Sequence, residues 1–88
     1  MSPAYHPRAY LAGIRNVSRG LTSRTKILET MEQGRTRISE ISEKSKLGPA
    51  CVSYHLKLML QQKIVHVVQT GREGRWTPTK YGQEKLFT

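Results

Sequence analysis

The side chains in this chain that are best suited to chemistry are cations that can bind a polyanion. Fifteen Lys and Arg against six Asp and Glu give a formal net charge of +9 on 88 residues. Such an excess attracts nucleic acid and releases its counterions. The sequence contains no phosphate-binding loop, no paired carboxylates in an apolar context and no Ser/His/Asp set that one fold would gather. We therefore expect a protein that binds nucleic acid and is not an enzyme.

The cysteine and histidine content predicts neither a disulfide nor a metal site. Cys51 is the single cysteine, and the three histidines are scattered along the chain, so we expect no metal and no cofactor. Cys51 is either a small half-buried thiol or an oxidisable one activated by a helix start and by Lys46. The apolar runs are too short to span a membrane and the first residues lack a signal-peptide run, so we expect a cytoplasmic, nucleoid-associated protein.

The stretch LGPACVSYHLKLML, residues 47–60, predicts a helix that presents most of the candidate DNA-binding residues. This helix should cover about residues 49–62, because Pro49 is well tolerated at a first helical position. Four apolar residues recur at helical steps and should form its packed face: Val52, Leu56, Met59 and Leu60. The opposite face holds the candidates for contact with the major groove: Pro49, Ala50, Ser53, Tyr54 and Lys57. Among these, Ser53 and Tyr54 are the candidates for base contact.

Further cations are candidates for contact with phosphates or a minor groove. Those that precede the helix are Arg35, Arg37, Lys44 and Lys46, and those near a predicted hairpin tip are Arg72 and Arg75. Each of them can also be a solvated surface charge, because charged residues are common on protein surfaces. Glu40, Glu43 and Glu73 lie among them, so the basic surface is patterned and not uniform. His55 and Trp76 are expected to pack against the core instead of touching DNA.

The elements that must position these residues are three helices followed by a β-hairpin. We predict a helix at about Arg24–Gln33, capped by Thr22 or Ser23 and ended by Gly34, and a second at about Glu40–Lys46, capped by Ser39. The runs IVHVVQT and RWTPT around GREG predict the hairpin, and Thr79 can cap a last helix at Lys80–Phe87. This order predicts a mainly α fold with a small β-hairpin: a winged helix-turn-helix, with a three-helix core, a wing and a short C-terminal helix.

The first 22 residues stand apart from this pattern. They contain three arginines and no acidic residue, which is typical of a basic arm. Several apolar residues after Pro7 nevertheless fall at near-helical steps, which is typical of a short amphipathic helix: Tyr10, Leu11, Ile14, Val17 and Leu21. We therefore expect residues 1–22 to be a basic N-terminal arm or a short helix, and residues 23–88 to be the winged helix-turn-helix domain.

The run RISEISEKSKLGPACVSYHLKLMLQQKIV, followed by a Gly-bounded hairpin and WTPTKYG, resembles the winged-helix regulators of the ArsR and MarR kind. The resemblance covers roughly Ser23 to Leu86, with V-S-x-H-L-K matched by residues 52–57. It implies DNA binding through the third helix. Three positions depart from the family pattern: Ser42, Gly48 and Lys63. Because a Lys at positive φ costs about 1 kcal/mol, the turn at Lys63 is expected to differ from the usual one.

These features together predict a transcriptional regulator that binds double-stranded DNA, and it should bind as a homodimer. One module offers few base contacts, and some apolar residues have no obvious place in a small core: Tyr5, Tyr10, Leu11, Leu58 and Phe87. The N-terminal segment and the last helix are the expected dimer surfaces. Two alternatives stay open: an architectural protein that coats DNA without sequence preference, and a protein-interaction winged helix within a replication or transcription assembly.

Overall fold

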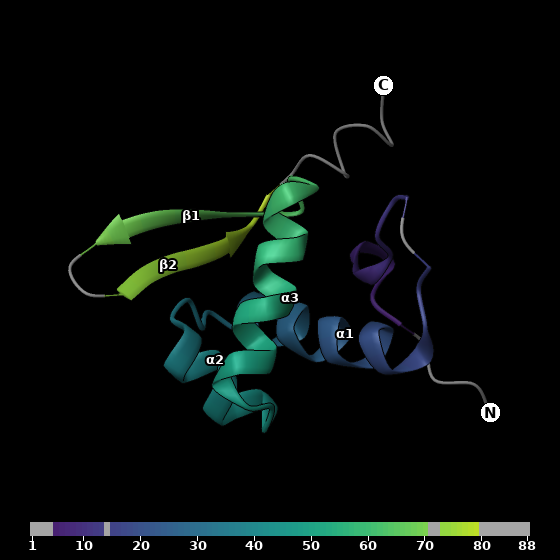
Figure 1. Ribbon diagram of the computed structural model, residues 1–88. Helices are drawn as coiled ribbons and strands as arrows, with labels where there is room; N and C mark the ends of the chain where they lie inside the picture. The colour runs from purple at the N-terminus through teal and green to yellow at the C-terminus, as the bar shows by residue number, and fades with distance from the viewer. Residues whose placement is uncertain (1–4, 14, 71–72, 80–88) are drawn as a thin grey trace.

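The computed structural model describes residues 5–13, 15–70 and 73–79, and it contains four helices and one hairpin in these ranges (Figure 1). In chain order the elements are the 3₁₀-helix η1 (Pro7–Ala9), α1 (Ser18–Glu32), α2 (Ile38–Ser45), α3 (Pro49–Gln61), β1 (Val65–Thr70) and β2 (Glu73–Pro78). The hairpin projects from the helices on the side opposite to η1. The predicted winged helix-turn-helix architecture is confirmed; the predicted helix at Lys80–Phe87 lies outside the described residues.

The core forms where the apolar faces of α1, α2 and α3 meet the base of the hairpin. Its fully buried side chains are Ile27, Leu28, Ile41, Val52, Leu56, Met59 and Val65. The predicted packed face of α3 is therefore confirmed at three positions, but Leu60 is 36% exposed. At about 100° per residue, Leu60 points roughly 80° away from Val52, at the edge of this face. His55 lies closer to the face on its other side and is buried instead of Leu60.

Helix α1 begins at Ser18, six residues before the predicted start at Arg24. The expected caps are wrong: Thr22 is exposed and Ser23 is buried, and both lie inside the helix. Leu21 and Leu28 are seven residues apart on the buried face, so apolar periodicity extends through this first turn. The predicted division between residues 22 and 23 thus falls within α1.

The end of α1 follows the prediction for Gly34. Gly34 has φ +98°, a conformation that favours glycine. Its N–H donates to the carbonyl oxygen of Met31 at 2.9 Å, and the Arg35 N–H donates to that of Thr30 at 3.3 Å. These two bonds form a Schellman motif, which satisfies carbonyls that the helix leaves open.

Helix α2 is held at its start by a carboxylate and not by the predicted cap. It begins at Ile38, so Ser39 lies inside the helix and is exposed. The carboxylate of Glu40 accepts hydrogen bonds from the backbone N–H groups of Thr36 and Arg37, each at 3.3 Å. These bonds lower the pKa of Glu40 because they stabilise its charged form.

The connection from α2 to α3 is three residues long, and it leads into Pro49 as predicted. Lys46 takes the left-handed conformation with φ 64°, and the hydroxyl of Ser42 donates to the carbonyl oxygen of Leu47 at 2.6 Å. Ser42, a departure from the family pattern, therefore stabilises this turn by a hydrogen bond that an Ala lacks.

The end of α3 differs from the expectation at Lys63, which does adopt the left-handed conformation, with φ 60°. The Lys63 N–H donates to the carbonyl oxygen of Leu60 at 3.0 Å, and the Ile64 N–H donates to that of Met59 at 2.9 Å. This is again a Schellman motif. The pair of hydrogen bonds and the burial of Val65, two residues further along the chain, offset the strain of a Lys at this position.

The N-terminal segment packs against the helices. Ala9 and Leu11 are buried in the core, and the only helical turn before α1 among the described residues is η1. The side-chain amide of Gln62, the residue that directly follows α3, accepts from the N–H of Ala12 at 2.6 Å and donates to its carbonyl oxygen at 2.8 Å. The side chain of Asn16 makes a similar pair of bonds with the backbone of Leu11. Ala12 is thus held to the end of α3, and Leu11 is held to Asn16.

The apolar residues proposed for a dimer surface divide between core and surface. Leu11 is buried, and Tyr5 and Leu58 are partly buried and pack against the core, so these three do have places in the monomer. Tyr10 is exposed, and its ring meets that of Tyr5 edge to face. Phe87 lies outside the described residues. The predicted surplus of apolar side chains is therefore smaller than the sequence indicates.

The hairpin is a two-stranded antiparallel sheet in which Val67 is opposite Trp76. Val65 and Trp76 face the helices and are buried, which confirms Trp76 as a core residue, whereas His66 and Val68 are exposed. The Thr79 N–H donates to the carbonyl oxygen of Ile64 at 2.9 Å and closes the base of the hairpin. None of the described helices is long and apolar enough to cross a membrane.

Candidate nucleic-acid interface

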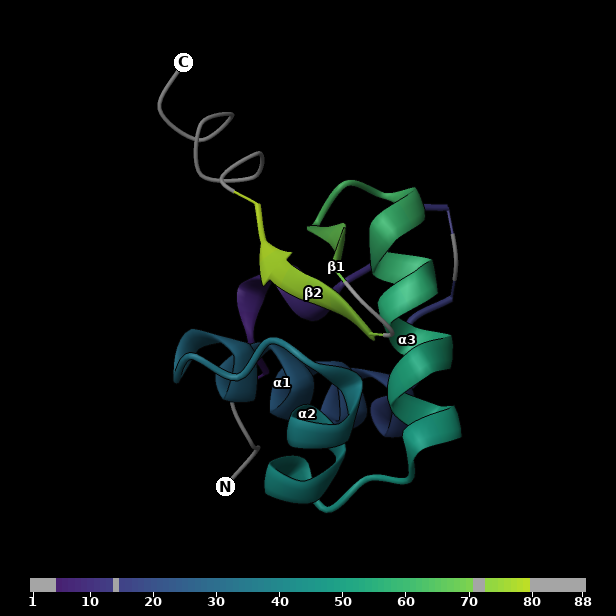
Figure 2. The same ribbon diagram turned by 90° about the vertical axis from the view of Figure 1, so that its left-hand side faces the viewer.

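The outer face of α3 carries the five residues predicted for the major groove. Pro49, Ala50, Tyr54 and Lys57 are exposed, and Ser53 is partly exposed. Tyr54 is 60% exposed although it is large and aromatic. In Figure 2, α1 and α2 lie on one side of α3 only, and the first half of the helix is open on the other side. One side of α3 is thus packed against the core, and the other side carries polar and aromatic groups.

The predicted phosphate-binding cations lie at three places around this helix. Lys46 is exposed at the connection from α2 to α3, and Arg35 and Arg37 are exposed in the connection from α1 to α2. Arg75 is exposed on β2, opposite Val68 on the outward face of the hairpin. Arg72 lies outside the described residues.

Three of the candidate cations are brought together with acidic side chains. Arg35, Lys44 and Lys46 line a surface hollow of about 390 Å³, which they share with Glu40 and Glu43. The two carboxylates reduce the local positive potential there, because their negative field partly cancels that of the cations. Lys57 and Arg75 do not line this hollow, so they are stronger candidates for phosphate contact.

The Lys and Arg side chains of the described residues are not neutralised by ion pairs. Within residues 5–13, 15–70 and 73–79, the one contact within ion-pair distance of 4 Å joins His6 to Glu32, and it involves no Lys or Arg. Cations that have no carboxylate partner remain available to phosphate groups, whose contacts dominate protein–DNA affinity. This free charge and the open face of α3 together form a surface suited to a DNA duplex.

A comparison with protein-family models identifies the chain. The model described as bacterial regulatory protein, arsR family, matches residues 22–67, from the second turn of α1 into β1. The chain belongs to the arsR family. No curated protein and no solved structure matches it. Family membership indicates a DNA-binding transcriptional regulator, in agreement with the sequence-based expectation.

Behind the outer face of α3, this arsR-family chain buries a cation that the sequence interpretation missed. Arg24 is 4% exposed, and its guanidinium Nε donates to the carbonyl oxygen of Ala9 at 2.6 Å. One Nη donates to the side-chain oxygen of Asn16 at 3.1 Å, and the other lies 3.4 Å from Nδ1 of His55. Burial lowers the pKa of Arg24, whereas the nearby Tyr54 phenol raises it. Arg24 therefore joins the N-terminal segment to α3.

His55 packs behind the outer face of α3 as predicted and is 8% exposed. Its pKa is lowered, first by burial and then by the charge of Arg24. A guanidinium can only donate, so Nδ1 of His55 accepts, and the neutral ring carries its proton on Nε2. The ring of His55 meets that of Tyr54 at 73°, with centroids 5.1 Å apart. A buried, neutral histidine thus contacts the exposed tyrosine.

Two features of the sequence are consistent with the burial of Arg24. It lies three residues after Leu21 and four before Leu28, which places a cation on the apolar face of α1. Gly20 lies one turn earlier, and a Cβ there would be 2.8 Å from a guanidinium nitrogen of Arg24. A glycine one helical turn from an arginine on an apolar face is the pattern to look for.

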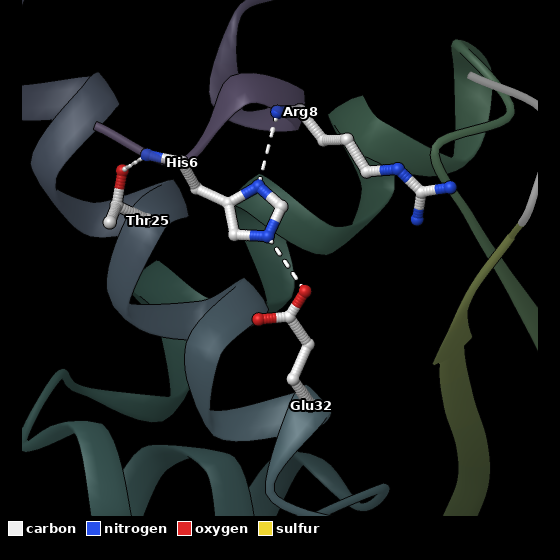
Figure 3. A network of polar contacts seen from close by, with 4 residues as sticks. All are labelled: His6, Arg8, Thr25 and Glu32. Carbon is white, nitrogen blue, oxygen red and sulfur yellow. Dashed lines mark hydrogen bonds and ion pairs between the residues drawn. The ribbon is translucent and has the colours of Figure 1, made fainter. Parts of the chain in front are cut away.

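A second polar network attaches the N-terminal segment to α1 (Figure 3). The His6 N–H donates to the hydroxyl of Thr25 at 2.9 Å, and the Arg8 N–H donates to Nδ1 of His6 at 3.1 Å. Because Nδ1 accepts, Nε2 carries the proton and donates to the carboxylate of Glu32 at 2.8 Å. This network lies along α1 and contains none of the residues predicted for DNA contact.

Metal-ligating side chains do not gather in the part of the chain that the structure describes. No group of three or more His, Cys, Asp or Glu side chains is placed there to hold a metal ion. Cys51 is a free, partly exposed thiol in the first turn of α3.

Proposed function

We propose that this arsR-family protein is a transcriptional regulator that inserts α3 into the major groove of double-stranded DNA. The observation that carries the proposal is the division of α3 by face. Val52, Leu56 and Met59 are fully buried, whereas Tyr54 on the other side is 60% exposed. Tyr54 lies with Ser53 and Lys57 on the side of α3 that the core leaves open, and this is the side that a recognition helix presents to base edges.

Each residue of the outer face has a role that its chemistry allows. Pro49 and Ala50 offer apolar contact to thymine methyl groups, and the hydroxyls of Ser53 and Tyr54 can hydrogen-bond to base edges. Lys57 provides a positive charge that can reach a phosphate. Pro49 and Ala50 lack polar side-chain atoms, so the hydrogen-bonded part of base recognition rests on Ser53 and Tyr54.

The wing and the connections supply the proposed backbone contacts. Arg72 and Arg75 bind phosphates or a minor groove, and Arg35, Arg37 and Lys46 bind phosphates beside the helix-turn-helix. These contacts fix the orientation of α3 on the duplex without reading its sequence.

We further propose that the protein binds DNA as a homodimer in the cytoplasm, in association with the nucleoid. One α3 contacts few base pairs, and a dimer reads two half-sites about one helical turn apart. The exposed ring of Tyr10 and the exposed Val17 favour a dimer surface that includes the N-terminal segment. Light scattering after size exclusion tests this: a mass near 20 kDa is expected, and a 10 kDa species at micromolar concentration contradicts the dimer.

Selection of bound sequences from a random DNA pool, followed by competition titration, tests the regulatory function. A specific regulator should prefer its selected site over random DNA by about 10³-fold or more. Tyr54→Ala should reduce this preference at particular base pairs and leave affinity for random DNA nearly unchanged. Binding without preference indicates an architectural DNA-binding protein instead. Absence of any binding at about 100 mM salt indicates that α3 meets a protein partner, because specific complexes persist under that condition.

A further inference from the structure

The contacts of Arg24 point to a role for a residue that is too buried to touch DNA. It lies on α1, yet its guanidinium contacts Ala9, Asn16 and His55, which belong to three separate parts of the chain. A buried cation without a carboxylate partner is unfavourable unless its N–H groups are well bonded. Among the described residues no carboxylate lies within ion-pair distance of Arg24. Such an arrangement holds the groups around Arg24 in one defined geometry and does less for the free energy of unfolding.

These contacts continue from Arg24 through His55 to Tyr54, the exposed residue proposed to read a base. Nδ1 of His55 accepts from Arg24, which fixes the orientation of the imidazole ring. The ring of Tyr54 rests edge to face on this imidazole. Edge-to-face contact restricts the rotation of an otherwise solvent-exposed side chain. The direction of Tyr54 thus depends on a ring that a residue of another helix holds in place.

We propose that Arg24 is a positioning residue for DNA sequence recognition: acting through His55, it holds the Tyr54 side chain in the orientation that reads a base. The effect on DNA preference rests on the proposed function of α3. The effect on the orientation of Tyr54 does not, and it is measurable in the protein without DNA. The contacts to Ala9 and Asn16 make the N-terminal segment part of this positioning, because they hold the guanidinium from the other side.

Three variants separate positioning from simple support of the fold. Arg24→Met keeps much of the volume and removes all three contacts, and Arg24→Lys keeps the charge but loses the planar fork. Gln62→Ala is the matched control, because it releases residue 12 from α3 and leaves the Arg24–His55 contact intact. All measurements are made on the full chain at a temperature at which circular dichroism shows each variant to be folded.

In the absence of DNA, nuclear Overhauser effects between the rings of Tyr54 and His55 report the orientation directly. We expect them in the wild type and in Gln62→Ala, and we expect them to be lost or strongly reduced in Arg24→Met and Arg24→Lys. Undiminished effects in both Arg24 variants overturn the proposal, whatever the protein does to DNA.

With DNA, a double-mutant cycle tests the path through Tyr54. Using the selected site and random DNA as probes, we expect Arg24→Lys to reduce the site preference about tenfold and to leave affinity for random DNA within twofold. In a Tyr54→Ala background the same change should have no further effect on preference, because coupled residues are non-additive. Full additivity overturns the positioning role. If the wild type shows no site preference, the proposed regulatory function fails, and the ring measurements still decide the orientation.

Discussion

The backbone N–H of Trp76 in β2 donates a hydrogen bond of 2.7 Å to the carbonyl oxygen of Thr36 in the connection between α1 and α2. Strand β2 is therefore paired with β1 on one side and hydrogen-bonded to this connection on the other. The indole of Trp76 is 8% exposed and belongs to the core. The wing is thus fixed at its base to the helix-turn-helix, and it carries Arg75 in a defined position relative to α3.

Replacement of Trp76 tests this attachment. Trp76→Ala should lower the free energy of unfolding by about 3–5 kcal/mol, because it removes a large buried side chain and leaves a cavity. Urea unfolding followed by circular dichroism at low temperature measures the loss. Val68→Ala is the control on the outward face of β1, where the side chain is half exposed, and it should cost less than about 1 kcal/mol. Equal losses for both variants contradict the inward packing of Trp76.

The left-handed conformation of Lys63 predicts that a glycine there stabilises the protein. A non-glycine residue at φ 60° is strained, and glycine relieves this strain while keeping the two hydrogen bonds that end α3. Lys63→Gly should raise the free energy of unfolding by about 0.5–1 kcal/mol in urea titrations. Gly34→Ala is the reverse experiment at φ +98° and should lower it by about 1 kcal/mol or more. A destabilised Lys63→Gly would mean that the lysine side chain contributes more than the backbone strain costs.

The lowered pKa of His55 predicts that acid destabilises the fold. In the unfolded chain His55 has a pKa of about 6.5, so below this value the unfolded state binds more protons than the folded state. The contribution of neutral His55 to stability is therefore complete above about pH 6.5 and is lost as the pH falls through that value toward the lower pKa of the folded state. The urea midpoint should be lower at pH 5 than at pH 8.

His55→Gln is the matched variant for this pH dependence. Its amide oxygen can still accept from Arg24, but it does not titrate. The difference in urea midpoint between pH 8 and pH 5 should shrink in this variant. Glu40, whose pKa is lowered by two backbone N–H groups, contributes only at more acidic pH, where carboxylates titrate. An unchanged pH dependence in His55→Gln would assign the effect to other groups.

The parts of the fold that the sequence predicts are those set by local rules. Pro49 marks the first turn of α3, Gly34 marks the end of α1, and the helical spacing of Val52 and Leu56 identifies a buried face. The exposed residues of α3 follow from the same periodicity, because residues opposite a packed stripe face solvent. These features depend on neighbours within about one or two helical turns.

The parts that the sequence does not reveal depend on contacts between distant segments. The partners of Arg24 lie 15 residues away at Ala9 and 31 residues away at His55, and one of them is a backbone carbonyl that carries no sequence signal. Similarly, Ala12 and Gln62 are 50 residues apart. Local patterns mark Arg24 only as the start of a helix and treat residues 1–22 as a separate segment. In the structure Arg24 is buried, and tertiary hydrogen bonds attach Ala9 and Ala12 of that segment to the helices.

Arg75 allows a test of the wing's role on DNA that does not depend on sequence preference. It is exposed on the outward face of β2, and it forms no ion pair with the described residues. If it contacts one phosphate, Arg75→Ala should weaken binding to the selected site and to random DNA by the same factor, and it should flatten the slope of log K against log salt by about 0.9. Lys26→Ala is the control for loss of charge alone, since Lys26 is exposed on α1 beside Glu29 in another surface hollow. A slope that changes equally in both variants would show that net charge acts at a distance and that the wing makes no phosphate contact through Arg75.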